Sequence, residues 1–180
     1  MTRIKTVDPG ATGKRTAELL ASVQKALGMT PNMMKTMAHS TVVLDGYLSF
    51  SGSLGRGALD AKFREQIALA VAEANGCDYC LSAHTAIGNI VGLDAGELAA
   101  ARQATGADAH ASAGLKFAQE IVRRRGQVSD DSLAEVRRAG YSDGEIAEIV
   151  ANVALNVFTN YFNAVAGTEV DFPRVTAKAV

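Results

Sequence analysis

The chain has 180 residues, with 18 Lys or Arg side chains against 19 Asp or Glu side chains and a formal net charge of −1. This length is sufficient for one hydrophobic core and short for two independent domains. Because the charges nearly cancel and no basic run exceeds Arg123-Arg124-Arg125, the composition argues against nucleic acid as a partner.

The N-terminal part of the chain divides into an arm and two predicted helices. Residues 1–13 show no helical pattern and are expected to form a flexible arm, whereas residues 14–180 are expected to form one helical domain. The first helix is predicted over about 14–27, where a glycine ends it. A second, methionine-rich helix should cover about 31–50, and the glycine-rich stretch 51–57 is expected to be a loop.

Two helices joined by a short turn are predicted at the centre of the chain. Residues 60–74 contain no Gly or Pro and are mainly good helix formers, so a helix should cover them and end at Asn75-Gly76. The next helix should cover about 77–91. We expect this central helical hairpin to be the most buried part of the protein.

The C-terminal half of the chain is also predicted to be helical. Helices are expected over about 94–103, 108–125, 129–140 and 142–165. The last of these is apolar nearly all round, which indicates burial in the core and against another subunit. Since no segment of useful length alternates between apolar and polar residues, we predict an all-α, single-domain bundle of about seven or eight helices.

A stripe of asparagines follows the last predicted helix. Asn152, Asn156 and Asn160 recur every four residues, and Asn163 lies in the same broad stripe. Buried amides need hydrogen-bond partners. We expect these side chains to form hydrogen bonds in the core or at a subunit interface, with the lining of a pocket beside the cysteines as the alternative.

The segment that carries the chemistry is EQIALAVAEANGCDYCLSAH, from Glu65 to His84, which contains both cysteines of the chain. On a helix, Cys77, Cys80 and His84 fall within a wedge of roughly 60°, so they share one face. The first turn of a helix favours thiolate over thiol and can lower a cysteine pKa from about 8.5 to between about 3.5 and 7.5. The segment therefore predicts a reactive thiolate.

The spacing of the two cysteines favours a reversible bridge. Side chains three residues apart on a helix have Cβ atoms about 5–6 Å apart, whereas a relaxed disulfide needs about 3.8 Å. A bridge between Cys77 and Cys80 would distort the first turn and should be easily reduced. In the preceding helix, Glu65 is a lone carboxylate on an apolar stripe, and we expect it to accept a proton.

The spacing E-x11-C-x-x-C-x3-H between two helices resembles the alkylhydroperoxidase AhpD-like proteins of the carboxymuconolactone decarboxylase superfamily. The similarity extends from the LGMTPNMM segment to the ANVALNVFTNYFN segment and so covers most of the chain. It implies that Cys80 attacks peroxide, that Cys77 resolves the oxidised thiol, and that Glu65 and His84 relay protons. Where the family motif has a histidine, this chain has Tyr79, whose hydroxyl donates a hydrogen bond but accepts a proton poorly.

The resemblance implies a thiol-dependent alkyl hydroperoxidase or disulfide oxidoreductase. Its partners would be a peroxide substrate and a dithiol or protein thiol reductant, with no bound cofactor or metal. The resemblance also implies a homo-oligomer, either a trimer or a hexamer. Because no segment has eighteen uninterrupted apolar residues and the N-terminus lacks the apolar core of a signal peptide, we expect a cytoplasmic protein with no membrane partner.

Three alternatives remain open from the sequence. The superfamily includes γ-carboxymuconolactone decarboxylases, which work without a C-x-x-C pair. Two cysteines, a histidine and a carboxylate also match the ligands of tetrahedral zinc. Finally, the chain could be a non-catalytic oligomeric module whose cysteines sense oxidation or pack in the core.

Overall fold

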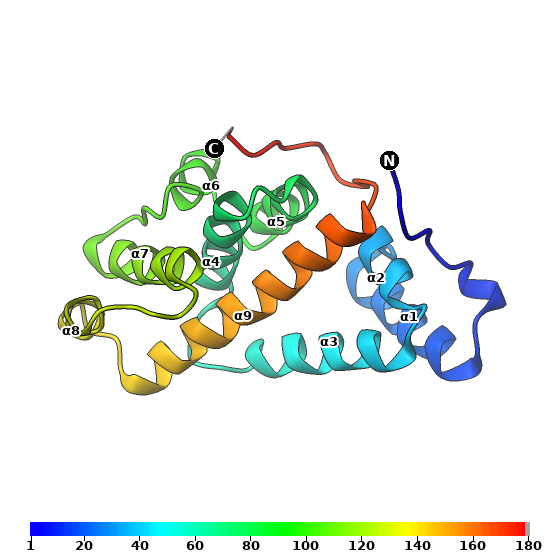
Figure 1. Cartoon of the computed structure of the whole chain (residues 1–180), viewed down its shortest axis with the longest axis horizontal. Helices are drawn as coiled ribbons and strands as arrows, with labels where there is room; N and C mark the ends of the chain where they lie inside the picture. The colour runs from blue at the N-terminus through cyan, green and yellow to red at the C-terminus, as the bar shows by residue number, and fades with distance from the viewer. Residues whose placement is uncertain (179–180) are drawn as a thin grey trace.

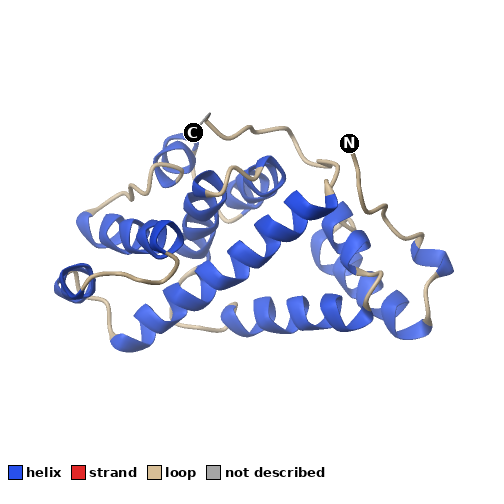
Figure 2. Ribbon diagram, in the orientation of Figure 1, coloured by secondary structure: helices blue, strands red, loops and turns tan. Residues whose placement is uncertain are grey.

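The computed structural model describes residues 1–178, which form nine α-helices and a short 3₁₀-helix at Pro9–Ala11 (Figure 1). The α-helices are Lys14–Leu27 (α1), Asn32–Met37 (α2), Thr41–Leu54 (α3), Ala61–Ala74 (α4), Asp78–Ile90 (α5), Ala95–Ala101 (α6), Ala109–Arg124 (α7), Asp130–Arg138 (α8) and Asp143–Ala166 (α9). Figure 2 shows no β-strand in this range, so the all-α prediction is confirmed. Residues 179 and 180, the end of the predicted helical domain, lie outside the described range.

The number of helices exceeds the predicted seven or eight because the methionine-rich segment forms two helices. α2 ends at Met37, and the backbone of Ser40 is extended, with φ −125° and ψ 110°. The Ser40 hydroxyl accepts a hydrogen bond from the Val43 N–H at 3.4 Å and so caps α3. α3 then continues to Leu54 through the first part of the predicted loop, since one helical glycine costs only about 1 kcal/mol.

α4 lies at the centre of the fold and packs against α5, α7 and α9. Every residue from Gln66 to Ala72 is buried. At the turn that follows, Gly76 has φ +65°, a backbone conformation that glycine adopts at little cost, and the chain folds back so that α5 packs on α4. The central hairpin is therefore buried, as the sequence predicts.

α9 crosses the molecule diagonally and contacts α3, α4, α5 and α7 (Figure 1). Its N-terminus carries a capping box formed by Ser142 and Glu145. α9 is long and apolar enough to cross a membrane, a test that core helices of soluble proteins also pass. Its inner face is buried against the other helices, while its outer face exposes Val150, Phe158, Tyr161 and Val165.

The N-terminal residues lie against the end of α9. The backbone N–H groups of Arg3 and Ile4 donate hydrogen bonds to the carbonyl oxygen of Ala166 at 2.8 and 3.0 Å. The backbone N–H of Val7 donates to the carbonyl oxygen of Lys35 at 3.2 Å. These three contacts join the predicted arm to α2 and α9.

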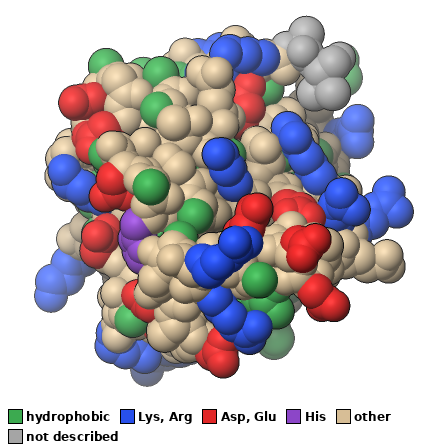
Figure 3. Space-filling view, turned by 90° about the vertical axis from the view of Figure 1, so that its left-hand side faces the viewer, with side chains coloured by type: hydrophobic (Ala, Val, Ile, Leu, Met, Phe, Trp, Pro, Cys, Tyr) green, Lys and Arg blue, Asp and Glu red, His purple; other side chains and the backbone are tan. Residues whose placement is uncertain are grey.

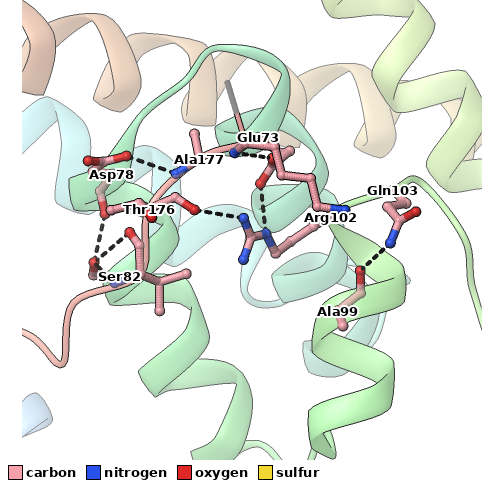
Figure 4. A network of polar contacts seen from close by, with 10 residues as sticks. Glu73, Asp78, Ser82, Ala99, Arg102, Gln103, Thr176 and Ala177 are labelled. Carbon is pink, nitrogen blue, oxygen red and sulfur yellow. Dashed lines mark hydrogen bonds and ion pairs between the residues drawn. The ribbon is translucent and has the colours of Figure 1, made fainter. Parts of the chain in front are cut away.

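The C-terminal segment, residues 168–178, runs across the end of α4 and the first turn of α5 (Figure 4). The Ala177 N–H donates to the Asp78 carboxylate at 2.9 Å. Arg102 joins the same network, because its guanidinium donates to the Glu73 carboxylate at 2.7 Å and to the carbonyl oxygen of Thr176 at 2.8 Å. The segment thus ties α4, α5 and the residue after α6 together.

Acidic and basic side chains are interspersed on the side of the molecule where α7 and α8 lie (Figure 3). The basic run of the sequence begins at the C-terminal end of α7, where Arg124 forms an ion pair with Glu120 at 3.1 Å. Cations near the C-terminus of a helix also interact favourably with its dipole. The basic run therefore has a local structural role at the end of this helix.

Candidate active site

The two cysteines lie at the start of α5, and their environments differ. Cys77 is the N-cap residue, with extended backbone (φ −92°, ψ 93°), and its sulfur accepts a hydrogen bond from the Cys80 N–H at 3.3 Å. Cys80 lies one turn further into the helix. Because Cys77 stands at the irregular edge of the helix rather than inside it, the two sulfurs face each other at the first turn.

Cys80 is 2 % exposed and lines a pocket of the described structure. Its sulfur accepts a hydrogen bond from the Asn163 side-chain amide at 3.3 Å. The pKa of Cys80 is lowered, first because the Cys77 thiol donates a hydrogen bond to it, and second because the side chains of Asn163, Asn160 and Thr159 also favour the thiolate. Of the two sulfurs, Cys80 is therefore the one that ionises more readily.

The pKa of Cys77 is shifted in the opposite direction to that of Cys80. Its pKa is raised, first because its proton is held in the hydrogen bond to Cys80, and second because the side chain is buried at 8 % exposure. The sequence places both cysteines near the positive end of the helix, but the structure shifts their pKa values in opposite directions. The thiolate form is therefore favoured at Cys80 and disfavoured at Cys77.

Glu65 and His84 form a hydrogen-bonded ion pair in the same pocket. The His84 Nδ1 lies 2.7 Å from the Glu65 Oε2, and both side chains are about four-fifths buried. Burial by itself disfavours the imidazolium, but the adjacent Glu65 carboxylate more than compensates, so the pKa of His84 is raised. The family resemblance implies that these two residues relay protons, and the structure brings both of them to the pocket that contains Cys80.

The pocket has a volume of about 570 Å³, which lies within the range of roughly 300 to 1,000 Å³ typical of small-molecule sites. It lies between α1, α3, α4, α5 and α9. Its apolar lining includes Met33, Leu48, Ala68, Ile87, Leu155 and Phe172. A cavity of this size and composition can hold an organic molecule beside the Cys80 sulfur.

Tyr47 is a pocket residue that the sequence does not reveal. It lies on α3 and lines the pocket together with Glu65 and Cys80. Burial raises the pKa of Tyr47 to about 12, and the negative charges of Glu65 and Cys80 act in the same direction. Its hydroxyl therefore stays protonated and can donate a hydrogen bond into the pocket. No spacing in the sequence connects it with the cysteines.

Tyr79 lines the pocket, but its hydroxyl is held by other groups. The hydroxyl donates a hydrogen bond to the Asp171 carboxylate at 3.0 Å and accepts one from the Met33 N–H at 3.1 Å. Burial is the main cause of its raised pKa. The ring of Phe172 packs edge-on against the ring of Tyr79, with centroids 5.9 Å apart. Tyr79 thereby anchors the C-terminal segment at the first turn of α5.

The asparagine stripe of α9 is buried and forms hydrogen bonds within the chain. Asn152 and Asn156 each donate to the carbonyl oxygen four residues before, at 2.8 and 2.9 Å. Asn160 accepts a hydrogen bond from Asn75 at 2.9 Å, at the turn of the cysteine hairpin. Asn163 donates a hydrogen bond to the Cys80 sulfur. Asn152 and Asn156 line the pocket. The asparagine stripe thus forms part of the hydrogen-bonded core and part of the pocket that contains Cys80.

A zinc site would require at least three of the candidate ligands to converge. Within residues 1–178, no group of three or more His, Cys, Asp or Glu side chains is arranged to hold a metal ion. Glu65 and His84 are instead paired with each other, and the two thiols are hydrogen-bonded to each other. The ligand geometry therefore does not match the zinc alternative.

Asn163→Leu is expected to raise the pKa of Cys80 by about one to two units, because it removes a hydrogen bond to a charged acceptor worth about 1.5–3 kcal/mol. The change keeps the size of the side chain. Since the thiolate is the reactive form, alkylation of Cys80 by iodoacetamide should then require a higher pH than in the wild type. The rate is measured against pH by mass spectrometry.

Asn156→Leu is the matched control, since the same change on the same helix removes a hydrogen bond to a backbone carbonyl rather than to the thiol. Its alkylation profile should coincide with that of the wild type. An unshifted profile for Asn163→Leu would contradict the assigned role of this amide.

Comparison with known proteins gives a family match for the segment that contains this hairpin. Residues 42–120 match the model of the carboxymuconolactone decarboxylase family. This range contains Glu65, Cys77, Cys80 and His84. A search of curated proteins found no match.

Several solved structures are similar to almost the whole chain. A peroxidase-related protein from Ralstonia eutropha JMP134, described as an alkylhydroperoxidase AhpD core, has 24 % identity and a TM-score of 0.84, with 94 % of this chain and 92 % of that chain covered. For a peroxidase-related protein from Silicibacter sp. TM1040, the identity is 24 %, the TM-score 0.82, and the coverages 92 % and 91 %.

A third similar structure is the debrominase Bmp8 in complex with 2,3,4-tribromopyrrole. It has 19 % identity and a TM-score of 0.82, with 95 % of this chain and 92 % of that chain covered. Similarities at this level of identity establish the fold. Residues 42–120, which contain the cysteine hairpin, thus match the carboxymuconolactone decarboxylase family, and the chain as a whole has the AhpD-like fold.

Proposed function

We propose that this protein is a thiol-dependent peroxidase that reduces an organic hydroperoxide with Cys80 as the attacking thiol. The observation that carries the proposal is the environment of the Cys80 sulfur. It lies in a pocket of about 570 Å³ and accepts hydrogen bonds from the Cys77 thiol and the Asn163 amide, which favour its thiolate. A thiolate beside a neutral second thiol is the arrangement that peroxide reduction requires.

In the first step, the Cys80 thiolate attacks the terminal oxygen of the hydroperoxide and the O–O bond breaks. Cys80 becomes a sulfenic acid, and the substrate leaves as an alkoxide that needs a proton. The His84 imidazolium can supply this proton, because Glu65 raises its pKa and both side chains line the same pocket. Before the attack, the Cys80 thiol loses its proton to the pair formed by Glu65 and His84, which returns a proton to the alkoxide afterwards.

In the second step, the Cys77 thiol condenses with the Cys80 sulfenic acid, which forms the disulfide and releases water. The proximity of the two side chains at the first turn of α5 makes this reaction intramolecular. A dithiol or protein thiol then reduces the disulfide by exchange and restores both thiols. The cycle uses no bound cofactor or metal.

The size of the pocket favours an organic hydroperoxide over hydrogen peroxide. A water molecule takes up about 30 Å³ of liquid volume, and hydrogen peroxide is only slightly larger. The pocket is many times this volume and its lining is mainly apolar. An organic substituent that fills it would bury apolar surface at about 25 cal/mol per Å², whereas hydrogen peroxide would not.

Reductive dehalogenation is the second candidate function. The structure of the debrominase Bmp8 with 2,3,4-tribromopyrrole has the same fold over 95 % of this chain. A dithiol can supply the two electrons for replacing carbon-bound bromine by hydrogen, with release of bromide and a proton and formation of the Cys77–Cys80 disulfide. Release of bromide from a brominated pyrrole would distinguish this activity from peroxide reduction. A decarboxylase, in contrast, would keep its activity without either thiol.

We include the oligomeric state and the cellular compartment of the protein in the same proposal. The exposed apolar side chains on the outer face of α9 suit contact with a second copy of the chain, in a trimer or hexamer. The free thiols suit a reducing compartment such as the cytoplasm. The protein would act there without membrane or nucleic-acid partners.

The proposal is tested by peroxide consumption in the presence of dithiothreitol. We expect catalytic turnover of cumene hydroperoxide, with kcat/KM at least about tenfold higher than for hydrogen peroxide, since filling the pocket is worth about 1.5–3 kcal/mol per large apolar group. No consumption of either peroxide would contradict the peroxidase proposal. Bromide release from a brominated pyrrole would then favour dehalogenation.

A further inference from the structure

The pocket beside Cys80 contains one cationic side chain that the chemistry above does not use. Among the described residues that line it, Arg64 is the only Lys or Arg, and Glu65 is the only Asp or Glu. Glu65 is already paired with His84 at 2.7 Å. Glu65 and His84 thus form one ion pair, and the other charges that the pocket can hold are the Arg64 guanidinium and the Cys80 thiolate.

Arg64 has no acidic partner within ion-pair distance in residues 1–178. One terminal N–H group of its guanidinium donates a hydrogen bond to the carbonyl oxygen of Leu59. An arginine has five N–H donors, and no other protein acceptor takes any of them in this part of the chain. A partly buried guanidinium that is left with free donors beside a cavity is prepared to bind an anion.

The loop before α4 holds Arg64 in this position. The Glu148 carboxylate accepts hydrogen bonds from the backbone N–H groups of Ala58 and Leu59 at 2.9 and 3.0 Å. Its two oxygens therefore bind the loop backbone and not the Arg64 guanidinium. The carboxylate also lies close to Gly57, where an added Cβ would come within 2.4 Å of it. The two hydrogen bonds to Glu148 hold the loop, and with it the Leu59 carbonyl, in place. This carbonyl accepts the hydrogen bond from Arg64 and so orients the guanidinium.

We infer that Arg64 binds the carboxylate of the substrate, and that the natural substrate is an organic hydroperoxide that also carries a carboxylate. The guanidinium fork matches a carboxylate with two parallel hydrogen bonds. The apolar lining of the pocket, including Leu48, Ile87 and Leu155, suits the hydrocarbon skeleton of such an acid. This inference rests on the peroxidase function proposed above and names its substrate class.

The test compares a fatty-acid hydroperoxide with its methyl ester, which has the same reacting group and no charge. The wild-type protein is expected to prefer the acid in kcat/KM by about 10- to 100-fold, the range of a hydrogen bond to a charged group. Arg64→Gln should reduce this acid-to-ester ratio to about one, mainly through the acid, and Arg64→Lys should retain part of it.

Lys62→Gln is the control, because Lys62 is an exposed cation on the same helix that does not line the pocket. It should leave the acid-to-ester ratio as in the wild type. Equal use of acid and ester by the wild-type protein, or an undiminished ratio in Arg64→Gln, would overturn the inference.

A binding measurement separates failure of this inference from failure of the proposed function. Isothermal titration of the reduced protein with decanoate and with decanol requires no turnover. We expect decanoate to bind more tightly by about tenfold or more, and Arg64→Gln to remove this difference. If no hydroperoxide is consumed while decanoate still binds through Arg64, the peroxidase proposal fails and the anion site stands. Equal binding of decanoate and decanol overturns the site.

Discussion

Cys80→Ser is expected to abolish the reaction with hydroperoxide, whereas Cys77→Ser should still react once. Without reductant, the wild-type chain should lose both free thiols to one equivalent of hydroperoxide, because Cys77 closes the disulfide. Cys77→Ser should lose its single thiol and stop as a Cys80 sulfenic acid. Cys80→Ser should lose none, since the remaining Cys77 thiol is kept neutral by its buried environment.

Free-thiol counts and trapping of the sulfenic acid with dimedone, followed by mass spectrometry, distinguish these three results. The Ser side chain is close in size to Cys, so folding is checked by circular dichroism on the same samples. Dimedone labelling of Cys77 in Cys80→Ser, with Cys77→Ser inert, would reverse the assigned roles. Retention of both thiols in the wild type would contradict the redox mechanism as a whole.

Glu65→Gln is expected to lower kcat/KM at pH 7 by at least about 100-fold, the scale of a lost general acid. The amide keeps the shape of the side chain but removes the charge that raises the pKa of His84. Without that charge His84 loses its proton at a lower pH. The fall in activity at high pH, where the proton donor is lost, should therefore begin at a lower pH than in the wild type.

The measurement is the pH dependence of kcat/KM with an organic hydroperoxide, for the variant and the wild type. Glu18→Gln provides the control, because Glu18 is an exposed carboxylate on α1 and has only a long ion pair with Arg15, at 4.0 Å. That variant should show the wild-type profile. If Glu65→Gln has the same rate and pH profile as the wild type, the relay through Glu65 and His84 is wrong.

Local patterns were sufficient to predict most of the fold. The stretch without Gly or Pro before Asn75-Gly76 is α4, and the capping sequence at Ser142 begins α9. These signals act within a few residues, so they are readable from sequence. The methionine-rich segment forms two helices where the sequence predicts one, because Ser40 is a good N-cap and begins α3.

The site could be predicted only as far as its residues are close in sequence. Glu65 and His84 are nineteen residues apart on adjacent helices, and their pairing follows from the hairpin. Asn163 is 83 residues from Cys80, and its choice of partner depends on how α9 crosses the hairpin. Arg64 looks like an ordinary surface arginine in the sequence. Its place beside a pocket results from the packing of several helices, which no local pattern encodes.

The lowered pKa of Cys80 depends in part on a residue that the ribosome adds 83 positions later. Both cysteines lie before the midpoint of the sequence, but the amide that hydrogen-bonds the Cys80 sulfur belongs to residue 163, near the end of α9. The Asp171 carboxylate that holds Tyr79 comes later still. A nascent chain that ends before residue 163 therefore lacks this hydrogen bond, and the pKa of Cys80 is lowered in full only after α9 has folded onto the hairpin.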